Sequence, residues 1–270
     1  MKIFLWNELA EFACGKKKLP KELSIGSVVT IGNFDGFHVG HRFLFDEAKK
    51  IAKKKSLALG VITFRESFAQ FFKAKKNYAG DVATLNQKLE FFSNDNFDFA
   101  IVIDFSMDFA TMSGSDFLNV VLAGTSMHTL VEGNDFTCGN CGSFGKNEIA
   151  NFANEKKFDV VFLNVVFENK ERVSSSLIRE CVLNADFLKA KKMLLRNYAL
   201  DASDFLWNDE MKIAREKCKQ VLPKNGSYDV AIFFEGGKTK SKLSIDSHFL
   251  RLENTEASLK KIKSIEFLSR

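Results

Sequence analysis

Residues 27–41 read SVVTIGNFDGFHVGH, an apolar run that leads into a loop with glycine at positions 32, 36 and 40. The apolar run at 27–32 predicts a buried strand, and the spacing of apolar residues at 43–55 predicts a helix after it. A helix start offers free backbone N–H groups and the positive end of the helix dipole. The stretch therefore predicts a polyphosphate site between the strand and the helix.

The histidines of this stretch, His38 and His41, point to chemistry at that site. Two of the four histidines in the chain lie in this short glycine-rich motif. A lone histidine is more often a packing residue, but two imidazoles beside a polyphosphate site can donate hydrogen bonds to phosphate oxygens as negative charge develops. The pair therefore predicts stabilisation of a reacting phosphate.

Strand-like and helix-like segments alternate through the first two thirds of the chain. Continuous apolar strands separated by helices predict an α/β fold, a Rossmann-like parallel sheet flanked by helices. Further strands are expected at 57–64, 99–103, 128–133 and 158–166, and helices at 115–123, 174–182 and 186–195.

The pattern changes after about residue 197. Turn signals at 225–226 and 235–237 precede short strand-like stretches at 228–234 and 241–245, which predicts a small antiparallel β-rich domain. The expected domains are therefore 1–197, carrying the chemistry, and 198–270.

The composition excludes several classes of protein. The 270 residues are 46% hydrophobic and 27% charged, as in an ordinary globular protein, and no apolar stretch approaches the roughly 18 residues that span a bilayer. The net charge is +5, with lysine runs at 16–18, 53–55 and 260–261 that lack an accompanying stripe of arginine and aromatic residues. We expect no membrane and no nucleic-acid partner, and the scattered cysteines favour the cytoplasm. The sequence leaves the oligomeric state open.

A second phosphate-binding candidate lies at 174–179. Ser174, Ser175 and Ser176 would open a helix, with Arg179 one turn further on. Hydroxyls and free N–H groups at a helix start suit phosphate oxygens, and a guanidinium binds them through paired donors. The alternative is an ordinary serine N-cap beside a surface arginine.

The chain resembles the His-x-Gly-His nucleotidyltransferases and, among them, the prokaryotic FAD synthetases. The adenylyltransferase module of that family carries Gly-x-Phe-Asp-Gly-x-His-x-Gly-His, and every fixed position is present at 32–41. Further stretches resemble the family in the same order, at 63–64, 84–89, 133–139, 173–179 and 184–198.

The resemblance implies transfer of AMP from ATP to FMN, which gives FAD and pyrophosphate with the help of Mg²⁺. Together with the residue patterns, it assigns a set of candidate site residues. The catalytic candidates are His38, His41 and Arg179; the ATP-binding candidates are Gly32, Asn33, Phe34, Asp35, Gly36, Gly40, Ser174, Ser175 and Ser176; the flavin-binding candidates are Phe64, Asp135 and Phe136; and Asp135 is the candidate metal ligand.

The sequence also departs from the family. Residues 65–68 read RESF where the family has a turn with proline and histidine, so the flavin contacts are expected to differ there. Bacterial members of the family usually carry a fused riboflavin kinase, which is marked by a Gly-Phe-Pro-Thr-Ala-Asn segment. No such segment occurs after Tyr198 in this chain. We therefore expect 198–270 to be a reduced kinase-like remnant without kinase activity. Cys138 and Cys141 form a Cys-x-x-Cys, interpreted as packing cysteines because a zinc site would need a second ligand pair.

Two other functions stay open. The chain could be a His-x-Gly-His transferase with a different phosphate acceptor, or a flavin- or nucleotide-binding protein without turnover.

Overall fold

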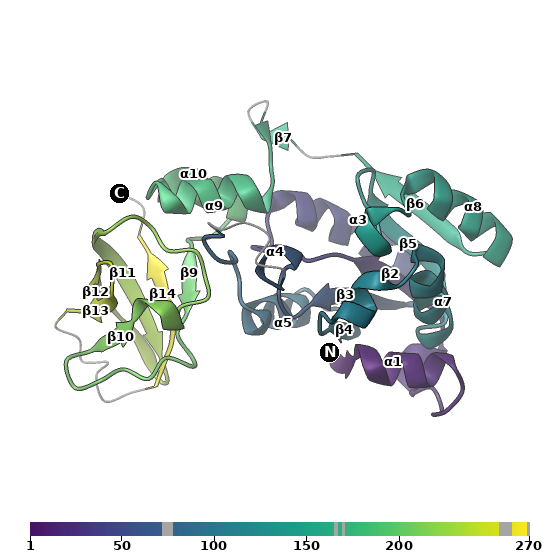
Figure 1. Cartoon of the computed structure of the whole chain (residues 1–270), viewed down its shortest axis with the longest axis horizontal. Coiled ribbons are helices and arrows are strands. Elements are labelled where there is room, and N and C mark those ends of the chain that lie inside the picture. The colour runs from purple at the N-terminus through teal and green to yellow at the C-terminus, as the bar shows by residue number, and fades with distance from the viewer. Residues whose placement is uncertain (72–77, 165–166, 169–170, 254–260, 269–270) are drawn as a thin grey trace. The chain divides into compact units, whose positions relative to one another are not determined.

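A computed structural model describes residues 1–71, 78–164, 167–168, 171–253 and 261–268. The chain forms two compact units (Figure 1). The first contains Met1–Phe34, Gly40–Phe72 and Leu89–Arg172, and the second contains Asp35–Val39, Lys73–Lys88 and Val173–Arg270. The glycine-rich motif thus passes from the first unit to the second after Phe34, and back after Val39.

The first unit contains the predicted parallel sheet. Its six strands are ordered β1-β4-β3-β2-β5-β6, and all neighbouring strands run parallel. The order extends in both directions from β2, which makes the carboxyl ends of β2 and β5 a topological switch point. The strands are β1 Lys2–Leu5, β2 Ser27–Ile31, β3 Ala58–Phe64, β4 Phe99–Ile103, β5 Met127–Gly133 and β6 Asp159–Leu163.

Helices cover both faces of this sheet. Helices α1 (Trp6–Ala13), α7 (Gly114–Gly124) and α8 (Lys146–Lys156) share one core with alternate strand residues. On the other face, Phe45 of α3 (Val39–Lys55) and Phe92 of α5 (Leu85–Asn94) pack edge to face, with ring centroids 6.0 Å apart. The short elements are α2 Lys21–Ser24, α4 Phe68–Phe71, α6 Met107–Thr111, the single-turn helix Asn140–Gly142, β7 Phe167–Glu168 and β8 Glu171–Arg172. The predicted α/β fold is confirmed.

The second unit contains an antiparallel sheet of six strands in the order β10-β13-β12-β11-β14-β9. The strands are β9 Ala199–Asp201, β10 Lys212–Ala214, β11 Gly226–Phe234, β12 Gly237–Ile245, β13 Phe249–Leu252 and β14 Ile262–Phe267. Helices α9 (Ser175–Leu183) and α10 (Phe187–Leu194) pack into the core of this sheet, where Phe187 stacks on Phe267 at 4.6 Å. The predicted antiparallel unit is confirmed, while the domain boundary at 197/198 stays a prediction.

Several element boundaries differ from the prediction. Helix α3 begins at Val39 instead of residue 43, because Gly40 and His41 interrupt the apolar spacing that marks a helix in the sequence. Strand β6 ends at Leu163, and residues 165–166 of the longer predicted strand lie outside the described residues. Within the described part of the chain, no helix has both the length and the apolar character needed to cross a membrane.

Candidate active site

In the first unit, the loop after β2 is built around the buried ring of Phe34. Phe34 has a left-handed backbone (φ 49°), and its ring packs edge to face against Phe45 and His41, at 4.9 and 5.2 Å. A Cβ on Gly32 would lie 2.9 Å from the Phe34 ring, so only glycine fits there. The hydroxyl of Thr63 donates to the backbone carbonyl of Asn33 (3.2 Å). The ring thus anchors the loop to α3, and its predicted contact with ATP stays a prediction.

His41 lies in the first turn of α3, because that helix begins at Val39. The first turn of a helix carries backbone N–H groups without intrahelical partners and the positive dipole end. Phe34 packs against the imidazole of His41 on one side. The motif thus leads into a helix as predicted, although the helix begins four residues earlier than the sequence indicated. Anion binding at its start stays a prediction.

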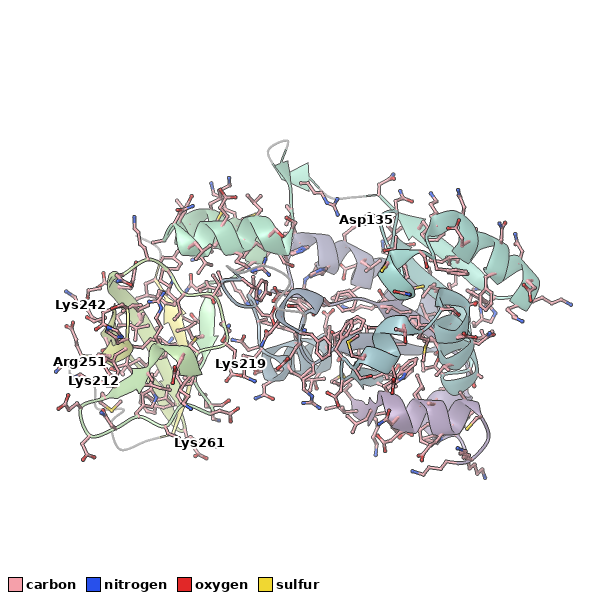
Figure 2. The ribbon with its side chains drawn as sticks, viewed as in Figure 1. Asp135, Lys212, Lys219, Lys242, Arg251 and Lys261 are labelled. Atoms are coloured by element: carbon pink, nitrogen blue, oxygen red, sulfur yellow. The ribbon has the colours of Figure 1, made fainter. Side chains whose placement is uncertain are left out.

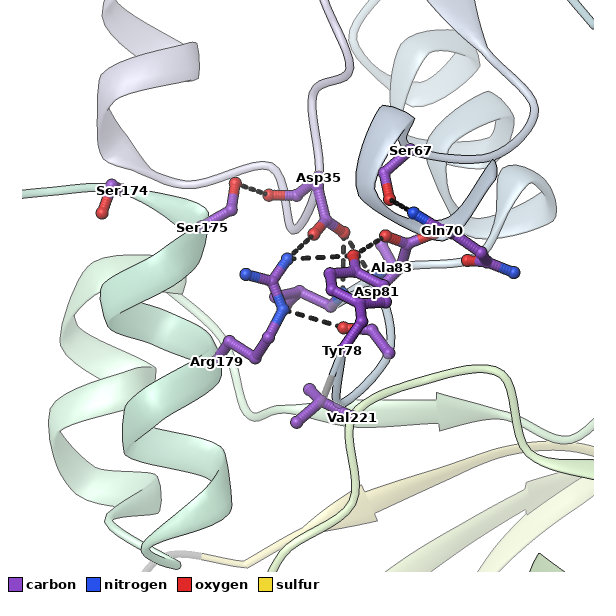
Figure 3. A network of polar contacts seen from close by, with 12 residues as sticks. Asp35, Ser67, Gln70, Tyr78, Asp81, Ala83, Ser174, Ser175, Arg179 and Val221 are labelled. Atoms are coloured by element: carbon purple, nitrogen blue, oxygen red, sulfur yellow. Dashed lines mark hydrogen bonds and ion pairs between the residues drawn. The ribbon is translucent and has the colours of Figure 1, made fainter. Parts of the chain in front are cut away.

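In the second unit, the Asp35 carboxylate is buried and fully engaged (Figure 3). Its Oδ1 accepts the backbone N–H groups of Val82 (2.8 Å) and Ala83 (2.9 Å). Its Oδ2 accepts Nη2 of Arg179 at 2.9 Å. Asp35 therefore links the segment before α5 to helix α9, and its predicted role in ATP binding stays a prediction.

The charges around Asp35 are close to balanced. Burial, together with the negative charge of Asp81, raises the pKa of the Asp35 carboxyl to about 6. The Ala83 N–H and the cations Arg179 and Lys88 oppose that rise. Burial lowers the pKa of Lys88, which is 1% exposed, and the carboxylates of Asp35 and Asp81 raise it. Two carboxylates and two cations therefore compensate one another inside this unit.

Arg179 is not the surface arginine of the alternative interpretation. Its side chain is only 17% exposed, its Nε donates to the Gly80 carbonyl (2.8 Å), and its guanidinium lies 5.0 Å from the centre of the Tyr78 ring. Ser174 is indeed an N-cap, accepting the Leu177 N–H at 3.2 Å. The neighbouring hydroxyls differ, since Ser175 donates to the Asp35 carbonyl (2.6 Å) and Ser176 is exposed. Phosphate binding by these groups stays a prediction.

Gln220 is a structural residue that the sequence did not reveal. It is 2% exposed, and its Nε2 donates to the carbonyls of Val82 (2.9 Å) and Ala199 (3.0 Å) and to Oε1 of Gln87 (3.1 Å). The backbone N–H of Val221 donates to the Asp81 carbonyl at 2.8 Å. The segment that holds the Asp35 carboxylate is therefore held in turn by the C-terminal part of the chain.

In the first unit, Asp135 follows β5 (Figure 2), and its carboxylate forms an exposed ion pair with Arg172. Both side chains are 53% exposed. The other flavin candidates, Phe64 and Phe136, are partly buried against the core of this unit, and Phe64 lies 5.3 Å from Phe105 between ring centroids. The flavin contacts of all three candidates stay predictions.

Glu132, the residue before Gly133, was missed by the sequence reasoning. Its carboxyl is buried at the switch point, where Oε1 accepts the Ile31 N–H at 2.5 Å. Burial raises its pKa well above the usual range. A single glutamate inside an apolar strand gives no sequence signal of this kind, because its partner is a backbone group 101 residues away.

The donor set for a metal is sparse. Among the described residues, no group of three or more histidine, cysteine, aspartate or glutamate side chains could hold an ion. Mg²⁺ in nucleotide sites is usually held by substrate phosphates with one or two carboxylates, a site that needs no such group, and the predicted Mg²⁺ stays a prediction. Burial raises the pKa of Cys138 to about 12, which keeps it a thiol, and none of the five cysteines forms a disulfide.

Comparison with known proteins identifies the family. The model of the FAD synthetase family matches residues 21–177, more than half of the chain. The chain belongs to the FAD synthetase family. It is thereby a nucleotidyltransferase, as the motif at 32–41 predicted.

Relatives in this FAD synthetase family are longer proteins. The bifunctional riboflavin kinase/FMN adenylyltransferase of Buchnera aphidicola subsp. Acyrthosiphon pisum is 29% identical over 222 residues, covering 78% of this chain and 70% of the relative. The protein of the same name from Bacillus subtilis is 29% identical over 182 residues, covering 67% of this chain and 57% of the relative. The chain thus spans little more than half the length of some of the relatives it matches.

A solved structure shows the same fold over nearly the whole chain. It is described as a macrolide-efflux protein from Streptococcus pneumoniae, and it covers 91% of this chain and 93% of its own, with a TM-score of 0.75 and 22% identity. At that identity, the likeness concerns the fold alone.

Proposed function

We propose that the protein is an FMN adenylyltransferase that transfers AMP from ATP to FMN and releases FAD and pyrophosphate. The observation that supports this most is the complete Gly-x-Phe-Asp-Gly-x-His-x-Gly-His motif, which follows β2 at the switch point and leads into α3, in a chain of the FAD synthetase family. Such switch points bind nucleotides in open α/β sheets.

The proposed reaction needs no covalent enzyme intermediate. A phosphate oxygen of FMN attacks the α-phosphorus of ATP, and the bond from that phosphorus to the bridging oxygen breaks. The electron pair leaves with pyrophosphate. Positioning and charge stabilisation supply the catalysis. His38 and His41 donate hydrogen bonds to the phosphate oxygens on which charge develops.

The other candidates have supporting roles in this proposal. Ser174, Ser175 and Arg179 bind the polyphosphate at the start of α9, and Mg²⁺ enters with ATP as part of the substrate. Asp135 forms a solvent-exposed ion pair with Arg172, so its carboxylate is available to bind the ion or to order the groups around the flavin phosphate. Phe64 and Phe136 offer partly exposed aromatic surface for the flavin ring. Cysteines without disulfides are in keeping with a cytoplasmic enzyme.

We further propose that the protein does not phosphorylate riboflavin. Its relatives are named as bifunctional, but residues 199–225 of this chain contain neither glycine nor threonine. A kinase loop needs glycine so that its backbone can approach the phosphate, and short hydroxyl side chains such as threonine that reach the phosphate and the metal. The antiparallel sheet then has a structural role.

One incubation tests the proposal against its rivals. The full chain is mixed with ATP, Mg²⁺ and either FMN or riboflavin, and the flavins are separated by chromatography. We expect FAD from FMN and no FMN from riboflavin. Binding of FMN and ATP without FAD would support the non-catalytic alternative, and AMP transfer to another phosphate acceptor in place of FMN would support a different transferase. FMN formed from riboflavin would reveal a working kinase.

A further inference from the structure

The three residues before His38 form a strained turn. Gly36 and Phe37 both have left-handed backbones, with φ of 87° and 50°. A Cβ on Gly36 would lie 2.8 Å from Cγ1 of Val82, so the turn is also tightly packed. Phenylalanine rarely adopts a positive φ, and such a conformation persists only where its surroundings enforce it.

Side chains from α9 and from the segment just after α10 hold the three successive carbonyls of this turn. Ser175 Oγ donates to the Asp35 carbonyl at 2.6 Å. Arg196 donates through Nη2 to the Gly36 carbonyl at 2.9 Å and through Nη1 to the Phe37 carbonyl at 3.4 Å. One guanidinium therefore spans the two peptide groups that immediately precede His38.

Arg196 is itself well anchored. Its Nη1 also donates to the Leu194 carbonyl, at the end of α10 (3.2 Å). The next two residues are also held, since Asn197 donates to Glu266 of β14 (3.2 Å) and the Tyr198 hydroxyl donates to the Val221 carbonyl in the segment before β11 (2.6 Å). The guanidinium thus projects from a fixed backbone onto the turn.

We propose that Arg196 is a positioning residue for His38. Its planar pair of donors fixes the orientation of the Gly36 and Phe37 peptides. These peptides set the direction in which the His38 side chain projects from the backbone. A lysine carries the same charge but has no fixed fork to grip two carbonyls at once. The inference rests on the proposed function only in taking His38 as a catalytic group.

The first test is kinetic and uses the full chain. Arg196→Lys should lower kcat for FAD formation roughly ten- to hundredfold, because small misplacements of a catalytic group cost that much. KM for ATP should change less than about twofold and the melting temperature should be nearly unchanged. Arg251→Lys, on the exposed face of β13 (Figure 2), is the matched control and should leave kcat as in the wild type.

A double substitution separates positioning from an independent effect. If Arg196 acts through His38, then Arg196→Lys should lower kcat less than about twofold when added to His38→Ala. An undiminished loss in that background would overturn the proposal.

A spectroscopic test does not depend on turnover. In the ligand-free chain with ¹⁵N-labelled histidine, His38→Ala assigns the His38 imidazole signals. Arg196→Lys should shift those signals and leave His128 and His248 unchanged. An unmoved His38 signal would overturn the proposal even if the enzyme made no FAD, and a chain without FAD formation would refute only the proposed function. If the lysine variant unfolds, Arg196→Gln, which retains one donor, takes its place in both tests.

Discussion

The loop after β2 and the loop after β5 each carry an aspartate beside an arginine, in opposite environments. Asp35 is 2% exposed and its carboxylate accepts two backbone N–H groups and Arg179. Asp135 and Arg172 are both 53% exposed. A carboxylate whose acceptors are occupied inside the protein holds structure, whereas one in water can exchange its partner for a ligand. The difference favours a structural role for Asp35 and a ligand-binding role for Asp135.

The largest expected difference between the two aspartates is in stability. Asp35→Ala should lower the free energy of unfolding by roughly 2–4 kcal/mol, because the N–H groups of Val82 and Ala83 lose their acceptor inside the protein. Asp135→Ala should lower it by less than about 1 kcal/mol, as for an exposed ion pair. Urea unfolding at pH 7 measures both. Equal losses in the two variants would remove the distinction.

The buried Asp35 carboxyl should also make the stability of the protein depend on pH. Asp35 has a folded pKa of about 6, above its ordinary value of 3.8, so the folded state holds its proton more tightly. The stabilisation is complete below about pH 4 and is lost as the pH rises through 6, by up to about 3 kcal/mol. Unfolding free energies measured from pH 4 to 8 should fall more for the wild type than for Asp35→Asn, which cannot ionise. Parallel curves would contradict this assignment.

Substitutions in the two loops should also differ in their effects on turnover. His38→Ala should lower kcat about 100-fold, or about 2.7 kcal/mol, because it removes a donor to the developing charge. His41→Ala should have an effect of similar size. Asp135→Asn should mainly raise KM, for FMN or for ATP, by several-fold. Wild-type kcat in the double variant of His38 and His41 would end the mechanism as proposed.

The smallest expected effect concerns the two arginines. Arg179→Lys retains the charge but loses the paired donors to Asp35 and Gly80, so kcat/KM for ATP should fall about tenfold, or 1.4 kcal/mol. Arg172→Lys, in the exposed pair, should change it less than about twofold. Steady-state kinetics with FMN held at saturation measure both variants. Equal values would show that Arg179 supports the structure around Asp35 without binding ATP.

Much of the parallel sheet could be predicted because its inner strands β2, β3 and β4 are buried on both faces. The stretch at 99–103 is a continuous apolar run that needs no partner information, and the stretch at 27–32 is mostly apolar. Strands β9 and β10 were missed because three residues are too few to establish a period. The order of the antiparallel strands depends on long-range pairing that composition does not record.

The candidate site was also predictable only where it depends on local sequence patterns. The histidine motif and the serine helix start are local patterns, so the sequence predicted them. The partners of Asp35 lie 47, 48 and 144 residues away, at Val82, Ala83 and Arg179, and no local pattern indicates them. For the same reason, Arg196 was visible only as part of a stretch that resembles the end of the family's module.

The buried amide of Gln220 has a consequence for how this chain can evolve. Its Nε2 satisfies carbonyls of Val82 and Ala199, and each would be left without that donor if the residue were lost. Val82 is also one of the residues whose backbone N–H holds Asp35. Stepwise loss of the C-terminal segment would therefore pass through intermediates in which the segment that holds Asp35 is weakened. Natural selection on FAD formation alone would then preserve the antiparallel sheet, whether or not it has any chemistry of its own.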